Sequence, residues 1–106
     1  MIVEGAVRKI SINAYERKAK ARKICIQRYG FLCSVCRCNL KDKYGEIGDG
    51  YIHVHHIKPL SEIGAEYELD PIRDLRPICP NCHAMIHTQT PPYTIEEMKD
   101  IIRNAT

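Results

Sequence analysis

The first regular pattern of apolar and polar positions runs from Asn13 to Tyr29. Apolar side chains recur there at roughly helical spacing, and basic side chains occupy the other faces. The segment is rich in good helix formers and lacks glycine and proline, and Asn13 and Gly30 are suitable as its N-cap and C′ residues. The pattern therefore predicts a helix over residues 13–29, preceded by an arm at residues 1–12.

The middle of the chain has short apolar runs separated by turn residues. Residues 33–50 are turn-rich, with three glycines in the last six positions, and predict a knuckle followed by a loop. Residues 51–57 carry β-branched and aromatic side chains and predict a strand. Residues 59–73 form a long connection that could include a helical turn. Residues 74–78 predict a second short strand, which Pro77 confines to a sheet edge because proline lacks the N–H of the ladder.

Two more helices are predicted toward the C-terminus. The first begins at Pro80 or Cys82 and ends at or before Thr90, because two prolines follow. The second is amphipathic and begins after Thr94, which can form a capping box with Glu97. No stretch is apolar enough to span a membrane, and the first residues lack the apolar run of a signal peptide.

Positive charge is concentrated in the first part of the chain, although the net charge is only +3. Residues 8–28 contain eight basic side chains and one acidic side chain, so the rest of the chain is net negative. A basic segment on such a body is typical of a protein that binds a polyanion. A solvated helix face is an equally good interpretation of the charge alone.

Four of the six cysteines form two C-x2-C pairs, Cys33 with Cys36 and Cys79 with Cys82. Each pair can present two thiolates from a tight turn, and two pairs complete the tetrahedron that zinc prefers. A chain with one Phe and no Trp has a small core, and zinc binding would help to fold it. We therefore predict a structural zinc ion. Clustered cysteines that bind metal also favour a reducing, cytoplasmic location.

The cysteines allow other interpretations. Cys38 could replace Cys36 as a zinc ligand, although C-x-C geometry is less usual. Cys25, on the first predicted helix, is expected to be a small buried apolar side chain. A redox dithiol is the alternative to zinc, but two matched pairs make it the weaker hypothesis.

All five histidines lie in two short segments, at residues 53–56 and 83–87. Residues four apart share a face of a helix, so His83 and His87 can bind one metal ion. A third imidazole would come from the HVHH segment, and neutral imidazole is the commonest nitrogen ligand of divalent transition metals. Three such ligands leave coordination positions open, as in catalytic sites. A further histidine nearby could act as a general base, because its ordinary pKa is about 6.5.

The histidine hypothesis has one geometric difficulty. In a regular strand His55 and His56 point to opposite faces, so the strand must bend or end there for both to serve one site. In the alternative interpretation His87 caps a helix end and His53 is a surface residue of the strand.

The combined motifs resemble the HNH endonucleases, whose ββα-metal domain runs from a strand ending in Asp-His or His-His to C-x2-C-H-x3-H on a helix. The matching segments are VHHI at 54–57, DLRPI at 74–78 and CPNCHAMIH at 79–87, behind the first cysteine pair. The basic segment before that pair also resembles the lead-in of HNH domains in bacterial restriction enzymes.

The resemblance implies a small α+β fold that is zinc-stapled and similar to a treble clef. It divides the chain into an arm with a basic helix at 1–30, a nuclease core at 31–90 and a C-terminal helix at 91–106.

Carried over residue by residue, the resemblance makes His55 a metal ligand and His56 the general base. His83 and His87 match the two helical positions that hold or face the metal. Asp74 stands where the family has the asparagine of its name, which braces the loop and helps to orient the base. An ionised Asp accepts hydrogen bonds but donates none, and it could instead pair with an imidazolium at position 56 or approach the metal.

The implied reaction is hydrolysis of a DNA phosphodiester bond, which leaves 5′-phosphate and 3′-hydroxyl ends. His56 would take a proton from the attacking water, while a divalent ion (Mg²⁺, Mn²⁺, Ni²⁺, Co²⁺ or Zn²⁺) stabilises negative charge on the phosphate. His53 matches no required position and could lie behind a metal ligand. Basic side chains would contact the DNA backbone without reading its sequence: Arg17, Lys18, Lys20, Arg22, Lys23, Arg73 and Arg76. For Arg73 and Arg76, an ion pair with a nearby Glu is an equal alternative.

Other functions stay open at this point. A non-catalytic zinc module that binds nucleic acid needs the four cysteines but not the histidines. A nuclease domain inactivated at position 74 and kept as a scaffold would keep both sets. Cleavage of both strands would need a homodimer or two successive nicks, and the last helix could pack on the core or on a partner subunit.

Overall fold

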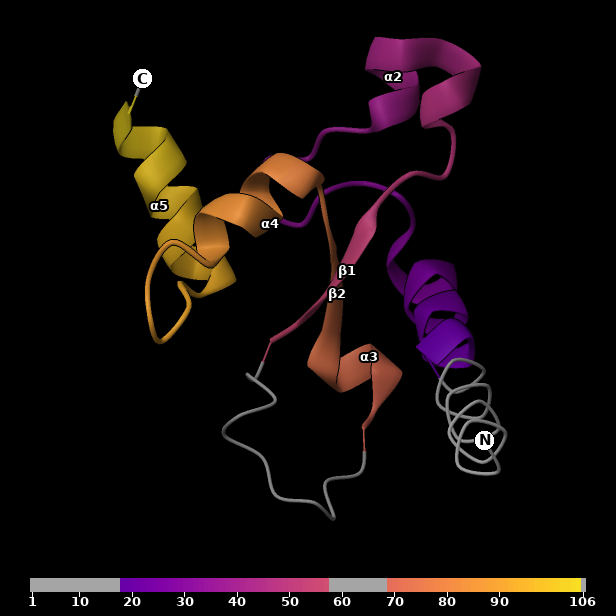
Figure 1. The fold of residues 1–106 in the computed structure, drawn as a ribbon, viewed down its shortest axis with the longest axis horizontal. Coiled ribbons are helices and arrows are strands. Elements are labelled where there is room, and N and C mark those ends of the chain that lie inside the picture. Colours follow the sequence, from indigo (N-terminus) through magenta and orange to yellow (C-terminus); the bar gives the residue numbers. More distant parts are fainter. Residues whose placement is uncertain (1–17, 58–68, 106) are drawn as a thin grey trace, which may run out of the picture.

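The computed structural model describes residues 18–57 and 69–105 (Figure 1). A two-stranded antiparallel sheet lies at the centre of the fold, between the helix of residues 18–29 and helix α4. We call the helix of residues 18–29 the basic helix. The other elements follow in the order α2 (Leu40–Tyr44), η1 (Gly45–Gly48), β1 (His53–His56), α3 (Pro71–Asp74), β2 (Leu75–Ile78), α4 (Pro80–Ile86) and α5 (Ile95–Ala105). The expected α+β class is confirmed.

The basic helix ends as its sequence predicts. Gly30 has a φ of 79° and donates its N–H to the carbonyl of Ile26 at 2.7 Å, which is the geometry of a glycine just past a helix end. Cys25 is fully buried, as expected for a small apolar side chain. Arg22 donates to the carbonyl of Ile52 at 2.8 Å and ties the helix to the residue before β1. The predicted start at Asn13, the arm at residues 1–12 and Arg17 lie outside the described residues.

The predicted loop after the first cysteine pair is wrong for residues 40–48, which form α2 and η1. The side chain of Asn39 caps α2 by accepting the N–H of Lys41 at 3.0 Å, and Gly45 ends the helix with a φ of 69°. No residue of α2 is buried, so this helix has no apolar stripe that the sequence pattern could have revealed. Its signals are the polar cap and the glycine alone.

Strands β1 and β2 pair antiparallel, with His53 opposite Ile78 and His56 opposite Leu75. They are the only strands in residues 18–57 and 69–105, so both are edge strands, and Pro77 has the edge position that its missing N–H requires. The helical turn expected before the second strand is α3. Asp70 caps it by accepting the N–H groups of Ile72 and Arg73. Residues 58–68 of the connection lie outside the described part of the chain.

Helix α4 follows β2 almost directly and carries the second cysteine pair. The Sγ atom of Cys79 caps it by accepting the N–H of Cys82 at 3.4 Å. The helix ends at Ile86, and His87 is its C-cap residue. Buried residues of this region form the core: Cys33, Val35, Ile52, Ile78, Cys79, Cys82, Ile86 and Met98. Three of the eight are cysteines of the two pairs, so the core is built around the cysteine cluster.

Helix α5 packs against this core through Met98, while Ile101 and Ile102 stay partly exposed. The predicted capping box is present: Thr94 accepts the N–H of Glu97 at 3.0 Å, and Glu97 accepts the N–H of Thr94 at 2.9 Å. Among the described residues no helix has the length and apolar character needed to cross a membrane.

Replacing Thr94 with alanine should lower the free energy of unfolding by about 1 kcal/mol, because one N–H at the start of α5 loses its acceptor. Thr94→Ser keeps the hydroxyl and should stay close to wild type. Chemical denaturation of the three proteins measures the difference. Equal stability of the alanine and serine variants would show that the capping box contributes nothing.

Candidate functional site

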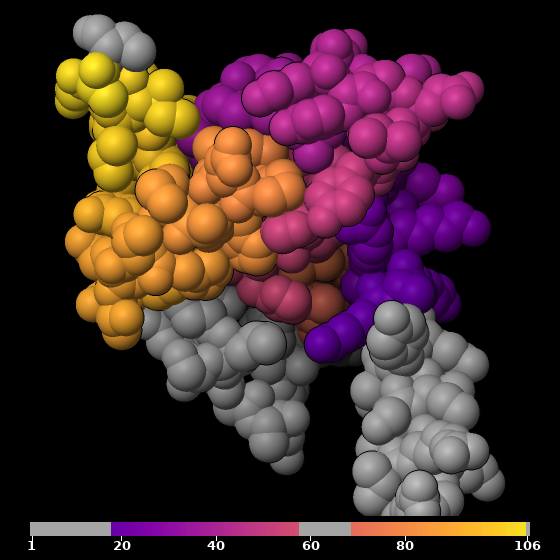
Figure 2. All heavy atoms as spheres, turned by 45° about the horizontal axis from the view of Figure 1, so that its top comes forward, coloured from indigo at the N-terminus to yellow at the C-terminus, as the bar shows by residue number. Residues whose placement is uncertain are grey.

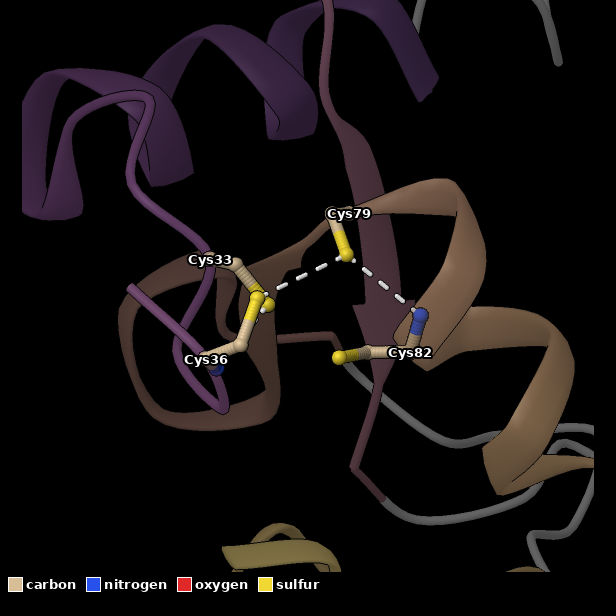
Figure 3. Close-up of side chains that lie close together, drawn as sticks. All are labelled: Cys33, Cys36, Cys79 and Cys82. Carbon is tan, nitrogen blue, oxygen red and sulfur yellow. Dashed lines mark hydrogen bonds between the residues drawn. The ribbon is translucent and has the colours of Figure 1, made fainter. Parts of the chain in front are cut away.

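The Sγ atoms of Cys33, Cys36, Cys79 and Cys82 lie within 4.8 Å of one another (Figure 3). The sulfur atoms of Cys36 and Cys79 are 3.8 Å apart. A tetrahedral zinc ion with Zn–S bonds of about 2.3 Å separates its sulfur ligands by about 3.8 Å, so the spacing of this pair suits zinc. The four cysteines form the set that the sequence predicts.

Backbone N–H groups point at the cluster from both turns. Cys33 accepts the N–H of Val35 at 3.4 Å and that of Cys36 at 3.5 Å, and Cys79 accepts from Cys82. Burial raises the pKa of the Cys33 and Cys82 thiols. A bound cation would oppose this effect of burial, since it favours the thiolate form of its ligands. The donor set and its spacing therefore fit a structural zinc ion.

Cys36, rather than Cys38, completes the group of four. Burial raises the pKa of Cys36, but hydrogen bonds from Cys38, Cys33 and Cys82 outweigh it and lower the pKa to about 7. Burial raises the pKa of Cys38, and the neighbouring thiols of Cys36 and Cys79 raise it further, to about 12. Burial raises the pKa of Cys33 and Cys82 as well, so the position of the sulfur atoms, and not thiol acidity, selects Cys36.

A second group of possible metal ligands is formed by His55, His83 and His87, whose ligand nitrogens also lie within 4.8 Å of one another. His55 comes from β1 and is 5% exposed, whereas His83 lies on α4 and His87 caps its end. The centroids of the three rings are 5.0 to 5.4 Å apart. The structure therefore brings together the three residues that the sequence proposes as ligands of one ion.

The surroundings of these rings favour their neutral form. Burial, followed by the neighbouring imidazoles His83, His87 and His56, lowers the pKa of His55 to about 4. Burial is also the main cause that lowers the pKa of His83. A neutral imidazole has a lone pair free for a metal ion, so the group can bind a cation at pH 7 without first losing a proton from these two rings.

His56 lines an open pocket of about 390 Å³ beside this cluster. His83 lines the same pocket, and the basic helix contributes Lys18 and Arg22 to it. In Figure 2 this part of the surface shows atoms of the segment around β1 between those of α4 and those of the basic helix. His55 and His56 therefore need not point to the same face of the strand. His55 joins the cluster, His56 faces the pocket, and His83 belongs to both.

Burial and the charge of Lys18 lower the pKa of His56, and the carboxylate of Asp74 opposes them. The net result is a lowered pKa, so that the imidazole of His56 is neutral at pH 7. A neutral imidazole at the wall of a pocket can accept a proton.

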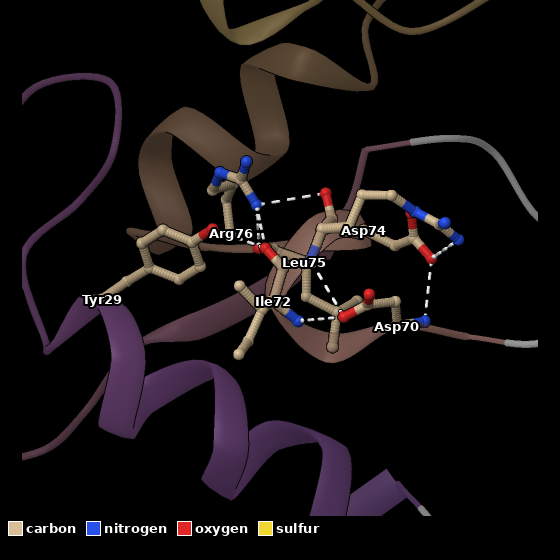
Figure 4. Close-up of polar contacts among 7 residues, drawn as sticks. Tyr29, Asp70, Ile72, Asp74, Leu75 and Arg76 are labelled. Carbon is tan, nitrogen blue, oxygen red and sulfur yellow. Dashed lines mark hydrogen bonds and ion pairs between the residues drawn. The ribbon is translucent and has the colours of Figure 1, made fainter.

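Asp74 braces the turn between α3 and β2 (Figure 4). Its carboxylate accepts the N–H of Asp70 at 2.9 Å and two hydrogen bonds from the guanidinium of Arg73 at 2.8 and 3.0 Å. Its backbone carbonyl accepts the N–H of Ile57, the residue after His56, at 2.9 Å. Each of these partners is a donor, so an acceptor-only carboxylate can serve at this position.

Arg76 has a structural role that the sequence did not reveal. Its guanidinium donates to the carbonyls of Ile72 at 2.8 Å and Leu75 at 2.7 Å, and it lies 4.5 Å from the ring centroid of Tyr29. The hydroxyl of Tyr29 donates to the same carbonyl of Ile72. The hydrogen bond from Tyr29 to Ile72 ties the end of the basic helix to α3 across a separation of 43 residues, which no local pattern encodes.

The other basic side chains that the sequence proposes as DNA contacts differ in exposure and in their bonding partners. Lys18, Lys20 and Lys23 are exposed. Arg22 is half-buried and bonded to a backbone carbonyl, and Arg73 is paired with Asp74 while 65% of its side chain stays exposed. Lysines of the basic helix are therefore the candidates whose charged ends lie at the surface.

Comparison with known proteins identifies one family. A family model described as HNH endonuclease matches residues 33–89, more than half of the chain. The match begins at the first cysteine of the zinc group and extends past His87, so it includes both groups of candidate metal ligands. No curated protein and no solved structure matches the chain significantly.

Loss of the structural metal should unfold the protein, because zinc binding of this kind contributes about 10–16 kcal/mol to folding. A strong chelator, or the substitution Cys82→Ser, should abolish the cooperative thermal transition seen by circular dichroism. Cys38→Ser is the matched control and should keep one tightly bound zinc per chain by elemental analysis. A folded Cys82→Ser protein without zinc would contradict the structural role.

Proposed function

This chain belongs to the HNH endonuclease family, and we propose from this that it is a metal-dependent DNA endonuclease of the restriction type, with His56 as its general base. Membership of the family supports a nuclease function and nucleic-acid binding in general. The choice of DNA, the restriction type and the roles of individual residues are our proposal. The observation that carries it is the pocket in which a neutral His56 lies next to the His55, His83 and His87 group and to Lys18.

His55, His83 and His87 would hold the catalytic ion with neutral imidazoles. When bound, such an ion supplies Lewis-acid stabilisation of the charge on the phosphate and on the departing 3′ oxygen. Imidazole ligands suit Zn²⁺, Ni²⁺ and Co²⁺, while Mg²⁺ and Mn²⁺ are the other candidates. Three protein ligands leave positions open for the substrate.

His56 accepts a proton from the water that attacks phosphorus. Its lowered pKa keeps the imidazole neutral at pH 7, and Lys18 on the pocket wall disfavours its protonated form. Asp74 acts on His56 through the backbone, because its carbonyl holds the N–H of Ile57 directly after β1. The position of the base is thus supported by the α3 turn, and cleavage leaves a 5′-phosphate and a 3′-hydroxyl.

The exposed lysines of the basic helix, Lys18, Lys20 and Lys23, contact the DNA backbone and position it without reading its sequence. Lys18 lines the pocket itself, so it lies where a phosphate next to the scissile bond would enter. One such pocket cuts one strand. A double-strand break would therefore come from a homodimer or from two successive nicks.

Conversion of supercoiled plasmid to the nicked form tests the proposal directly. We expect nicking with added Mg²⁺, Mn²⁺ or Ni²⁺, and a loss of about 10²–10⁴-fold in rate for His56→Ala, the usual contribution of a general base. EDTA added just before the assay should stop the reaction.

Unchanged zinc content and melting temperature would show that the His56→Ala variant is folded. Full activity of this variant would eliminate His56 as the base. Absence of nicking with any divalent metal, while the zinc-loaded wild type still binds DNA, would indicate a binding module instead.

Two substitutions at Asp74 distinguish a structural role in the α3 turn from a direct role in the reaction. Asp74→Asn keeps an oxygen for the N–H of Asp70 and should retain most of the nicking activity. Asp74→Ala removes the acceptor of this exposed hydrogen bond and should cost about 0.5–1.5 kcal/mol of stability, together with a lower nicking rate. Denaturation curves and plasmid assays of both variants measure the effects. Equal loss of activity in both, with stability unchanged, would mean that the carboxylate acts in the reaction itself.

A further inference from the structure

A fourth imidazole, that of His53, contacts the histidine group and lines the pocket together with His56 and His83. The Nδ1 atom of His53 is 2.9 Å from the Nδ1 atom of His83, and the two ring planes meet at 83°. Two ring nitrogens at this distance share one proton, so one of them donates and the other accepts. The hydrogen bond joins β1 to α4 at the candidate metal centre.

The position of His53 on the strand explains how it reaches His83. His53 and His55 are two residues apart on β1, so their side chains share one face of the sheet. Both rings lie near the ring of His83, with centroids 5.1 Å and 5.3 Å from it. The group of ligand nitrogens that lie within 4.8 Å of one another contains His55 but not His53. His53 therefore supports the group from outside.

The hydrogen bond determines which atom of His83 can bind metal. An imidazole that binds a metal through one nitrogen generally donates the N–H of its other nitrogen to a fixed acceptor, which sets the tautomer and the ring orientation. When the Nδ1 atom of His83 carries the proton that it shares with His53, its Nε2 atom keeps a free lone pair. His53 would then serve as the acceptor, a role that a carboxylate or a carbonyl oxygen has in most such sites.

We propose that His53 is a positioning residue that accepts the Nδ1–H of His83 and so presents the Nε2 lone pair of His83 to the catalytic metal ion. This inference rests on the proposed metal-dependent function of the same group, but it concerns metal affinity and can be measured without DNA. His53 acts through His83 and does not itself bind the ion.

The test uses the full chain with zinc retained in its cysteine site. Ni²⁺ is titrated calorimetrically into the wild type and into His53→Leu and His53→Asn. Leucine removes the acceptor with little change in volume, whereas asparagine places a side-chain oxygen close to the position of Nδ1. His53→Asn is therefore the matched control for His53→Leu, because it changes the same residue but keeps an acceptor. Zinc content and melting temperature establish that each variant is folded.

We expect His53→Leu to weaken Ni²⁺ binding by about 10–100-fold, the usual effect of losing the partner of a metal-bound histidine. His53→Asn should recover most of that affinity. In plasmid assays the His53→Leu defect should appear as a higher metal concentration for half-maximal nicking. If the wild type does not nick DNA, the affinities still decide the role of His53, so failure of the two proposals can be told apart.

Several results would overturn the inference. Wild-type Ni²⁺ affinity in His53→Leu would show that the hydrogen bond does not support the site. Equal weakening in His53→Leu and His53→Asn would show that an acceptor is not what matters. A changed visible spectrum of bound Co²⁺ in both variants would then identify His53 as a direct ligand. An increased KM for DNA with unchanged metal affinity would make His53 a substrate contact.

Discussion

The cluster of four cysteine sulfurs determines where helix α4 lies, and most of the site depends on α4. Cys79 caps this helix and Cys82 lies within it, while Cys33 and Cys36 come from a turn between the basic helix and α2. The N–H of Ser34, in that turn, also donates to the carbonyl of Pro77 in β2 at 2.9 Å. A core with so few large apolar side chains gives little other reason for α4 to hold one orientation. The sulfurs therefore position His83, although none of them takes part in the proposed chemistry.

The site also depends on the alternation of side chains along β1. Four consecutive residues provide His53 and His55 on one face and His56 on the other, and the strand ends there. In the proposed mechanism, one peptide unit thus separates the metal ligand His55 from the general base His56. The histidine group and the pocket lie next to each other, because His83 contributes to both.

Much of this arrangement was predictable because it is encoded locally. The C-x2-C pairs, the capping box at Thr94 and the glycine after the basic helix each combine a few neighbouring residues with one geometric requirement. Helix α2 escaped prediction because it buries nothing and therefore has no periodic apolar signal. The contacts of Arg76 with Tyr29, and of His53 with His83, join segments far apart in sequence. The spacing of residues in the sequence can identify such candidates, but only the structure shows which of their atoms are in contact.

The hydrogen bonds of Arg22 and Arg76 to backbone carbonyls affect how many basic side chains of this protein can contact a phosphate. Binding to DNA releases the counterions that phosphates condense, and the salt dependence of affinity reports how many cations reach the backbone. A guanidinium bonded to backbone carbonyls, as in both arginines, keeps its charge but is held away from a phosphate. The salt dependence of DNA affinity should therefore reflect the number of exposed lysines that contact phosphates and not the total number of basic residues. For the proposed DNA substrate, a small number of such contacts from the described residues would mean weak binding and rapid release of the cut product.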